Sequence, residues 1–366
     1  MSKRFILLSL VALILLGSVT SSLADTANTA KTLTLDEAYD LALKNNIDFL
    51  KAGLSYDQAM LEAEQADYNA DKINSDSVGS LQEAQTKYVS SKQKLLAEEV
   101  AKQTYDISIE QTKNLVEKNY YDVLKAENLI KTREAAVKRA QEQFSLVQKK
   151  YKAGTAVKTD VNRAEVTLAN AKADLANAQR DFKNTQVAFT KVIGLDVSRD
   201  VKLAQILKYE KVALPTVEEL TKQALVSRLD LKKVKNAQTI AQINYDLVIG
   251  YQAPNTFTGR SSKIDLERAK LDLLQQEQNV KAEVISTLFQ IQKSDEVVQL
   301  LAKGLEQAKD NYSLAQRRYQ IGVGSAVDVI SASVDLADSE AKYVEAVYNY
   351  ALAKNQLKTI TIVSKQ

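Results

Sequence analysis

The chemistry open to this chain is limited by two residue types that it lacks. Its 366 residues include no cysteine and no histidine. Disulfides, thiolate nucleophiles, imidazole bases and His/Cys metal sites are therefore excluded. Catalysis would have to rest on carboxylates, Lys, Tyr or Ser/Thr gathered in one constellation, and the sequence shows no such gathering. We therefore predict that the protein is not an enzyme and holds no cofactor or metal.

Two aspartates nevertheless occupy equivalent places in a repeated motif. The frame Tyr-x-x-Gly-x-x-x-x-x-Asp-Val occurs at residues 151–161 and again at residues 319–329. Aromatic and apolar residues on both sides of the frame match at the same offset. Such self-similarity indicates two tandem copies of one structural unit. Asp160 and Asp328 are the acidic members of the two copies.

The motif predicts a tight turn between two helices. Gly154 and Gly322 lie where a helix has to end in the left-handed conformation, which glycine adopts most easily. A few residues later, Thr159 with Asp160, or Asp328, can cap the helix that departs. Each copy of the motif is therefore interpreted as the turn of a helical hairpin.

Long helices are predicted on both sides of these turns. Residues 80–153, 155–193 and 325–366 contain neither Gly nor Pro and are rich in Lys, Gln, Ala, Glu and Leu, which are strong helix formers. Apolar residues recur at steps of three and four, as a coiled-coil seam requires. In the segment after Gly154 these residues are Val161, Ala164, Leu168, Ala171, Leu175, Ala178 and Phe182.

Each half of the chain also opens with a helix-start signal. Thr34 precedes Glu37, and Thr216 precedes Glu219, each pair standing ahead of an apolar-periodic run. We therefore expect each half to contain a short capped helix, a long helix, a Gly turn and a long returning helix. Together the halves make an all-α, four-helix antiparallel assembly of long coiled-coil hairpins in two tandem repeats.

The predicted organisation has four parts. Lys3 and Arg4 precede an apolar stretch and a small-residue cleavage site that ends at Ala24, so residues 1–24 read as a signal peptide. The alternative, a membrane anchor, needs about 20 apolar residues, more than this stretch offers. Repeats follow at residues 25–195 and 214–366. A linker at residues 196–213 either forms short strands or lies along the helices.

Charge argues against nucleic acid as a partner. Removal of Lys3 and Arg4 with the signal peptide leaves 47 basic and 46 acidic residues. A near-neutral, exported chain lacks the basic excess that phosphate binding requires.

Four features give the sequence a family resemblance. They are the tandem halves, the opening Leu-Thr-Leu-Asp-Glu-Ala with Ala-Leu following, the segment Asn119-Tyr120-Tyr121-Asp122, and the Tyr-x-x-Gly…Asp-Val turns. In these features the chain resembles the TolC-like outer-membrane efflux proteins over nearly its whole mature length. The resemblance implies a homotrimer that forms an α-helical tunnel in the cell envelope. It also implies a periplasmic adaptor and an inner-membrane pump as partners, with a small-molecule or protein cargo.

One part of the family pattern is missing. The family carries two membrane-crossing strands at the hairpin end opposite the Gly turns, and a strand of this kind needs roughly 10 residues. Residues 71–80 and 250–262 stand at the corresponding places and are too short for two strands each. We expect the β-barrel to be lost or reduced to loops. Residues 252–260 read as a loop with one exposed phenylalanine.

The resemblance also implies functional residues. Asp160 and Asp328 match the aspartate of the family's tip turn, where rings of carboxylates line a constricted entrance and favour cations. The alternative is that they only stabilise the start of a helix through its dipole. Ser331 and Gly324 replace a second acidic residue and an arginine of the family's tip. The turns themselves match those presented to the adaptor: Gly154, Thr155, Ala156, Val157, Gly322, Val323, Gly324 and Ser325.

The leading hypothesis is therefore a helical duct of an envelope efflux or export system. The main alternative is a coiled-coil spacer or scaffold of the cell envelope that transports nothing. A helical protein lying on a membrane surface ranks third, because Lys is mixed with Glu and Asp along the helices instead of being concentrated on one face.

Overall fold

The computed structural model describes residues 32–73 and 78–361. The chain divides into two units, residues 1–31 and residues 32–366, and all described residues belong to the second. The predicted signal peptide, residues 1–24, lies outside the described residues.

Helices make up almost all of the described residues, so the all-α prediction is confirmed. Within the described ranges there is no β-strand, only an isolated parallel bridge between Leu33 and Leu203. In chain order the helices are α1 (Leu35–Asn45), α2 (Ile47–Asp71), α3 (Leu81–Ala84), the π-helical turn η2 (Gln85–Ser90), α4 (Ser91–Lys152), α5 (Lys158–Val192), α6 (Val217–Ser227), α7 (Leu229–Tyr251), α8 (Phe257–Gln320) and α9 (Ala326–Thr359).

The two short opening helices form as predicted. Thr34 accepts a hydrogen bond from the Glu37 N–H while the Glu37 carboxylate accepts from the Thr34 N–H, so both members of the capping box of α1 are present. Thr216 and Glu219 do the same for α6. Each box satisfies N–H groups that the helix start leaves unpaired.

Each half contains one helix more than we expected. We predicted that the short capped helix would lead directly into the long helix that ends at the Gly turn. Instead, α2 and α7 first run to the opposite end, and the long helices α4 and α8 return from there. Asn46 causes the first break, because its backbone is extended and its side chain accepts from the N–H groups of Asp48 and Phe49. A single polar residue inside a polar helical sequence does not announce such a break.

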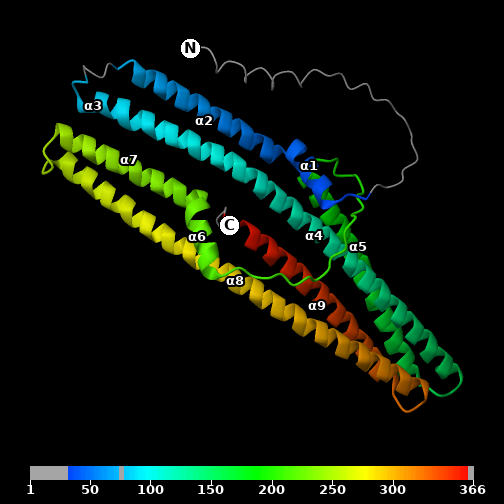
Figure 1. Ribbon diagram of the computed structural model, residues 1–366. Helices are drawn as coiled ribbons and strands as arrows, with labels where there is room; N and C mark the ends of the chain where they lie inside the picture. The colour runs from blue at the N-terminus through cyan, green and yellow to red at the C-terminus, as the bar shows by residue number, and fades with distance from the viewer. Residues whose placement is uncertain (1–31, 74–77, 362–366) are drawn as a thin grey trace, which may run out of the picture. The chain divides into compact units, whose positions relative to one another are not determined.

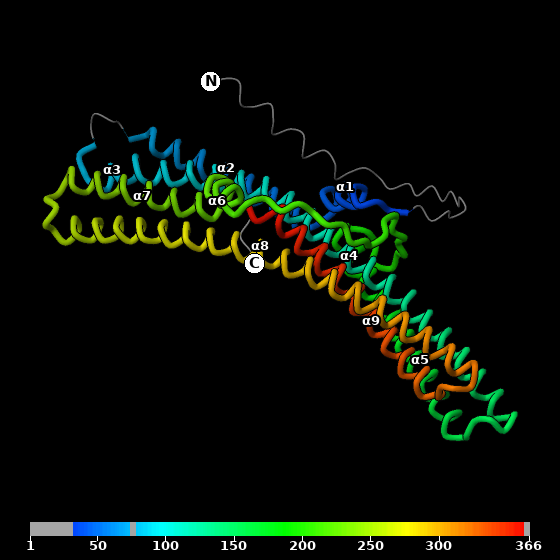
Figure 2. The backbone as a smooth tube through the Cα atoms, turned by 60° about the horizontal axis from the view of Figure 1, so that its bottom comes forward, coloured from blue at the N-terminus to red at the C-terminus, as the bar shows by residue number. Residues whose placement is uncertain are grey.

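The two long helices organise the rest (Figure 1). Helices α2 and α5 pack against successive parts of α4, and α7 and α9 pack against successive parts of α8. Contacts of α4 with α7, and further along with α9, join the two repeats. At one end the helices therefore lie in the order α2, α4, α7, α8, and at the other in the order α5, α4, α9, α8 (Figure 2). Each of the two ends is therefore built from four helices, as the repeat predicted, and α1 and α6 pack on the long helices between them.

Three apolar clusters form the core. One joins α1, α4 and the end of α5 around Tyr120 and Phe189. Its counterpart in the second repeat joins α6, α8 and the end of α9 around Ile291 and Tyr350. The third lies at the Gly-turn end, around Tyr319. All seven residues of the seam predicted for α5 are buried or half-buried, so that prediction is confirmed.

The linker at residues 196–213 lies along the helices, the second of the two alternatives. Leu207 packs against both of the equivalent apolar clusters. Tyr209 stacks edge-on against Tyr350 of α9 and donates a hydrogen bond to Asp295 of α8. The linker is therefore fastened to the second repeat by its side chains and not by strand pairing.

The loop at the end opposite the Gly turns is shorter than predicted. α8 begins at Phe257, so residues 257–260 are helical and only residues 252–256 form the connection from α7. Thr256 caps α8 by accepting from the Gly259 N–H. A Cβ at Gly259 would lie 2.9 Å from the Ala253 carbonyl oxygen, so this glycine permits close packing and does not mark a loop. The expected exposure of Phe257 is confirmed. The other connection includes residues 74–77, which lie outside the described residues.

Arg228 separates α6 from α7 in the second repeat, and its side chain is completely buried. Its guanidinium lies 2.5 Å from an oxygen of Asp230 and 2.6 Å from an oxygen of Glu283 on α8. Burial alone would raise the pKa of Asp230, but the hydrogen bonds and charge of Arg228 outweigh burial and hold that pKa below its usual value. The network ties the helix break to the long helix.

Replacing Arg228 with Met should lower the free energy of unfolding by about 2 kcal/mol, because two partly buried carboxylates lose their counter-charge. The lowered Asp230 pKa adds stability that is fully present above the usual carboxyl pKa of about 4. That stability is lost as the pH falls through the folded-state pKa, so the deficit of the variant should shrink in acid. Urea unfolding at neutral and acidic pH measures both effects. Arg268→Met, which removes an exposed ion pair, is the control and should change stability by less than about 0.5 kcal/mol. Equal losses of unfolding free energy in the two variants would contradict the stabilising role of the Arg228 ion pairs.

Candidate functional site

The first Gly turn closes α4 with a left-handed glycine, as predicted. Gly154 has a φ of 75°. Its N–H donates to the Tyr151 carbonyl at 3.0 Å, and the Thr155 N–H donates to the Lys150 carbonyl at 2.9 Å. These bonds satisfy carbonyl groups that the end of the helix would otherwise leave unpaired.

The second turn repeats this geometry and needs a second glycine. Gly322 has a φ of 85°. The N–H groups of Val323 and Gly324 both donate to the Arg318 carbonyl at 3.0 Å. A Cβ at Gly324 would lie 3.0 Å from the Cβ of Arg318, so the close approach of the chain requires glycine there.

The structure brings the two turns together at one end of the described unit (Figure 2). Tyr319 of α8 is buried in an apolar cluster with Val147 of α4 and Ala164 of α5. The Lys150 ammonium lies 3.7 Å from the centre of the Tyr319 ring and donates to the Tyr319 carbonyl at 2.7 Å. A cation over an aromatic face and a charge-assisted hydrogen bond thus join the hairpins at their tips.

The two predicted aspartates occupy equivalent positions, in the first turn of α5 and of α9. Asp328 forms a capping box with Ser325, each accepting from the backbone N–H of the other at 3.1 Å. These bonds to Ser325 lower the pKa of Asp328, and the nearby Arg318 charge lowers it further. The predicted capping role of Asp328 is therefore confirmed.

The start of α5 differs from the prediction. Val157 occupies the capping position and makes no side-chain cap hydrogen bond, so Thr159 and Asp160 do not cap the helix. The sequence GTAV lacks the Ser that stands just ahead of α9. Burial of Tyr319 raises its phenol pKa, and the Asp160 charge raises that pKa further. Asp160 therefore lies beside the cluster that joins the two tips.

Apolar side chains are exposed at both turns. Val157 is 60% exposed, Ile321 74% and Val323 73%. Tyr151, Gly154, Thr155 and Gly322 are exposed as well, and Gly324 is half-buried. The turns are thus the outermost part of this end, available to a partner.

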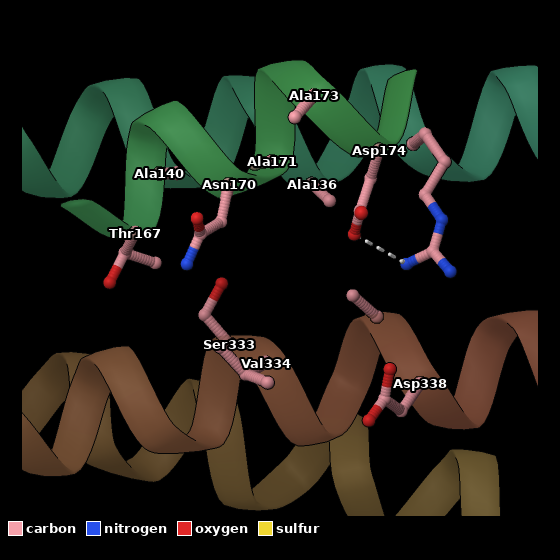
Figure 3. Close-up of a pocket in the computed structure, with 12 residues that line it drawn as sticks. Ala136, Ala140, Thr167, Asn170, Ala171, Ala173, Asp174, Ser333, Val334 and Asp338 are labelled. Atoms are coloured by element: carbon pink, nitrogen blue, oxygen red, sulfur yellow. Dashed lines mark ion pairs between the residues drawn. The ribbon is translucent and has the colours of Figure 1, made fainter. Parts of the chain in front are cut away.

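A groove of about 410 Å³ lies between α5 and α9, with α4 at its floor (Figure 3). Small side chains line it, among them Ala136 of α4, Ala171 of α5 and Ala337 of α9. At one end Arg133 pairs with Asp174 at 3.6 Å. We did not anticipate this groove, although alanines at helical spacing are the signal that close helix approach or a groove leaves in a sequence.

Two exposed apolar stripes lie along α2 and α8, and apart from Phe257 their residues were not predicted from the sequence. Successive residues of an α-helix are rotated by about 100° around its axis. Around the circumference of the helix, the α2 stripe occupies an arc of roughly 60°, and the α8 stripe occupies an arc of roughly 100°. The α2 stripe consists of Ile47, Leu50, Leu54, Leu61 and Tyr68. The α8 stripe consists of Phe257, Ile264, Leu271, Leu274, Ile285, Phe289 and Leu300. The sequence did contain a signal for these stripes, because several of their residues are seven positions apart and therefore lie on one face of a helix.

Within residues 32–73 and 78–361, no group of three or more acidic side chains is placed to hold a metal ion. No helix in those ranges combines the length and the apolar character needed to cross a bilayer.

Comparison with known proteins identifies a family. The model of the family described as "Outer membrane efflux protein" matches residues 89–195 and 219–361, which is more than half of the chain. The two matched segments fall in the two repeats. No curated protein sequence matches the chain.

Solved structures share the fold at low sequence identity. CusC, described in connection with transmembrane channel formation, is 15% identical, with 89% of this chain and 91% of that chain covered and a TM-score of 0.75. The CmeC outer membrane channel of Campylobacter jejuni is 13% identical, with 90% and 85% covered and a TM-score of 0.74. The outer membrane protein VceC of Vibrio cholerae is 13% identical, with 90% and 96% covered and a TM-score of 0.73.

Replacing Gly322 with Ala should lower the free energy of unfolding by about 1 kcal/mol, because an alanine at φ 85° crowds its own carbonyl oxygen. Gly304, in the interior of α8, is the matched control, since a Cβ there meets nothing within 4 Å. Gly304→Ala should raise stability by about 0.5–1 kcal/mol. Thermal unfolding measures the stability of both variants relative to the wild-type protein. Changes of the same sign would mean that the left-handed turn is not required.

Proposed function

The chain belongs to the outer membrane efflux protein family, and we propose that three copies of it form an α-helical duct through which cargo leaves the cell envelope. The family members are efflux proteins, so we also propose that the chain carries out no catalysis of its own. A periplasmic adaptor and an inner-membrane pump are the proposed partners. Residues 1–24 are proposed to direct export into the envelope. The repeats at residues 25–195 and 214–366, joined by the linker at residues 196–213, are proposed to form the wall.

The exposed apolar stripes carry this proposal. At the end opposite the Gly turns, α2 and α8 are the outer helices of the four-helix order, and each bears a stripe on a face that no other described helix covers. Apolar patches of this length on a soluble surface mark interaction sites. Because the stripes differ, α2 of one copy would pack against α8 of the next, a head-to-tail contact that closes into a ring.

A non-transporting spacer of the cell envelope is the second candidate function. It would need the same long helices but no closed ring. Chain assembly therefore separates the two proposals, since a spacer can exist as a monomer or a dimer, whereas a duct requires a closed ring with a central channel.

We further propose that the turn end is the mouth of the duct. Gly154–Val157 and Gly322–Ser325 are the proposed adaptor-contacting turns, and their exposure supports this role. Asp160 and Asp328 are the proposed entrance residues. The bonds of Asp328 to Ser325 support the alternative helix-stabilising role equally well, so an experiment has to separate the two roles.

Replacing both Leu54 and Leu61 of α2 with Lys should abolish the ring and leave folded monomers, because the side chains are exposed in the single chain. Mass photometry of the mature protein measures assembly, and circular dichroism measures folding. Val226→Lys on α6, which is 84% exposed and outside both stripes, is the control and should assemble normally. Adding Ile264→Glu and Leu271→Glu should restore rings through opposite charges. A wild-type protein that is monomeric at micromolar concentration would contradict the duct.

Replacing both Asp160 and Asp328 with Asn should leave assembly intact, because Asn keeps the size and the hydrogen-bond acceptor of Asp. If these carboxylates line the entrance, cells that produce only the double variant should accumulate more of a fluorescent efflux substrate than wild-type cells. Glu306→Gln and Glu296→Gln, two exposed changes within α8, provide the charge-matched control. Unchanged efflux with an intact ring would assign the aspartates to helix stabilisation alone.

A further inference from the structure

The Gly-turn end carries a strong excess of positive charge. Residues 147–163 contain five basic side chains and one acidic one, and residues 314–331 contain two basic and one acidic. We call these two segments the turn-end surface. The rest of the chain is close to neutral, because its whole net charge is only +3. The excess is therefore concentrated at this end.

Helix ends explain only part of the excess. Lys149 and Lys152 lie in the last turn of α4, where a cation offsets the negative end of the helix dipole. Lys158, however, is the first residue of α5, and Arg163 follows within its second turn. A cation near a helix N-terminus meets the positive end of the dipole and destabilises the helix slightly. Folding of α5 therefore gives no reason for these two residues.

Most of these cations also lack a partner within the chain. In the described part of the protein, no carboxylate pairs with Lys149, Lys152, Lys158, Arg163 or Arg317. All five are exposed. By contrast, Lys150 is committed to Tyr319, and Arg318 acts on Asp328. Five free cations at one end thus remain available to an external group.

Apolar side chains accompany the free cations. Val157, Ile321 and Val323 are exposed at the apex of the turns. A surface that joins apolar contacts to a one-sided charge recognises a partner with its own apolar residues and the opposite charge. We infer that the turn-end surface binds a protein partner whose contacting surface is rich in Asp and Glu around a small apolar patch. This inference rests on the proposed function, in which the turns receive an adaptor.

The observations favour an acidic protein over an anionic lipid surface. Segments that dock on bilayers present Trp, Tyr, Phe or Leu to the interface. The large apolar side chains most exposed at the turns are those of Val157, Ile321 and Val323, and Tyr151 is the one exposed aromatic residue of the turn-end surface. The more exposed aromatic residues Tyr68 and Phe257 belong to α2 and α8, which pack against α4 and α7, respectively, at the opposite end.

The test uses the full mature protein and two synthetic amphipathic helices that share a Leu face. One helix carries Glu on its polar face and the other carries Lys. The Glu helix should bind at least about tenfold more tightly than the Lys helix, and added salt should weaken its binding. Lys149→Glu combined with Lys152→Glu and Lys158→Glu should reduce that binding by about tenfold or more. Reversal of Lys92, Lys102 and Lys118, which are exposed on the same helix far from the turn, is the control and should leave it unchanged.

Equal binding of the two helices, or an equal loss in the control variant, would overturn the inference. Binding to phosphatidylglycerol vesicles in place of the Glu helix would also overturn it and assign the surface to lipid. Ring assembly is measured on the same samples by mass photometry. Intact rings without preference for the Glu helix would refute the acidic partner alone, whereas absence of rings would refute the duct.

Discussion

The structure depends on one constraint, which is that a helix of 62 or 64 residues cannot bury its apolar face by itself. α4 and α8 have these lengths, so each needs a neighbour along about 95 Å. No single returning helix supplies that neighbour. Two shorter helices cover successive parts of each long helix instead: α2 and α5 cover α4, and α7 and α9 cover α8. The helix breaks, caps and turns of the fold make this arrangement possible.

The break between the short opening helix and the helix that follows it uses different chemistry in the two repeats. Asn46 ends α1 and caps α2 with its side chain, whereas Arg228 ends α6 and anchors the break to α8 through buried ion pairs. The same backbone path is thus held by a neutral cap in one repeat and by charge in the other. The two tandem copies therefore hold equivalent helix breaks with different side chains.

The need to cover the apolar face of each long helix also explains which apolar surfaces are buried and which stay exposed. Where four helices meet, the apolar seams are covered from within the chain, and the Lys150–Tyr319 contact fixes the tips of the hairpins to each other. Among the described residues no further helix packs against the outer faces of α2 and α8, so their apolar stripes stay exposed. The single chain therefore joins its two hairpins at the tips through its own contacts, whereas the apolar stripes along α2 and α8 have no cover within the described residues.

The sequence by itself determined the helices, the two left-handed glycine turns and the tandem repeat. These features depend on local physics: helix propensity, capping boxes at Thr34 and Thr216, and the freedom of Gly154 and Gly322 at positive φ. Only the tertiary structure decided that Phe257 starts a helix and that the chain breaks at Asn46 and Arg228 before α2 and α7. It also decided which apolar residues remain uncovered and which cations lack a partner. Those properties depend on contacts between residues far apart in the chain, which no local pattern records.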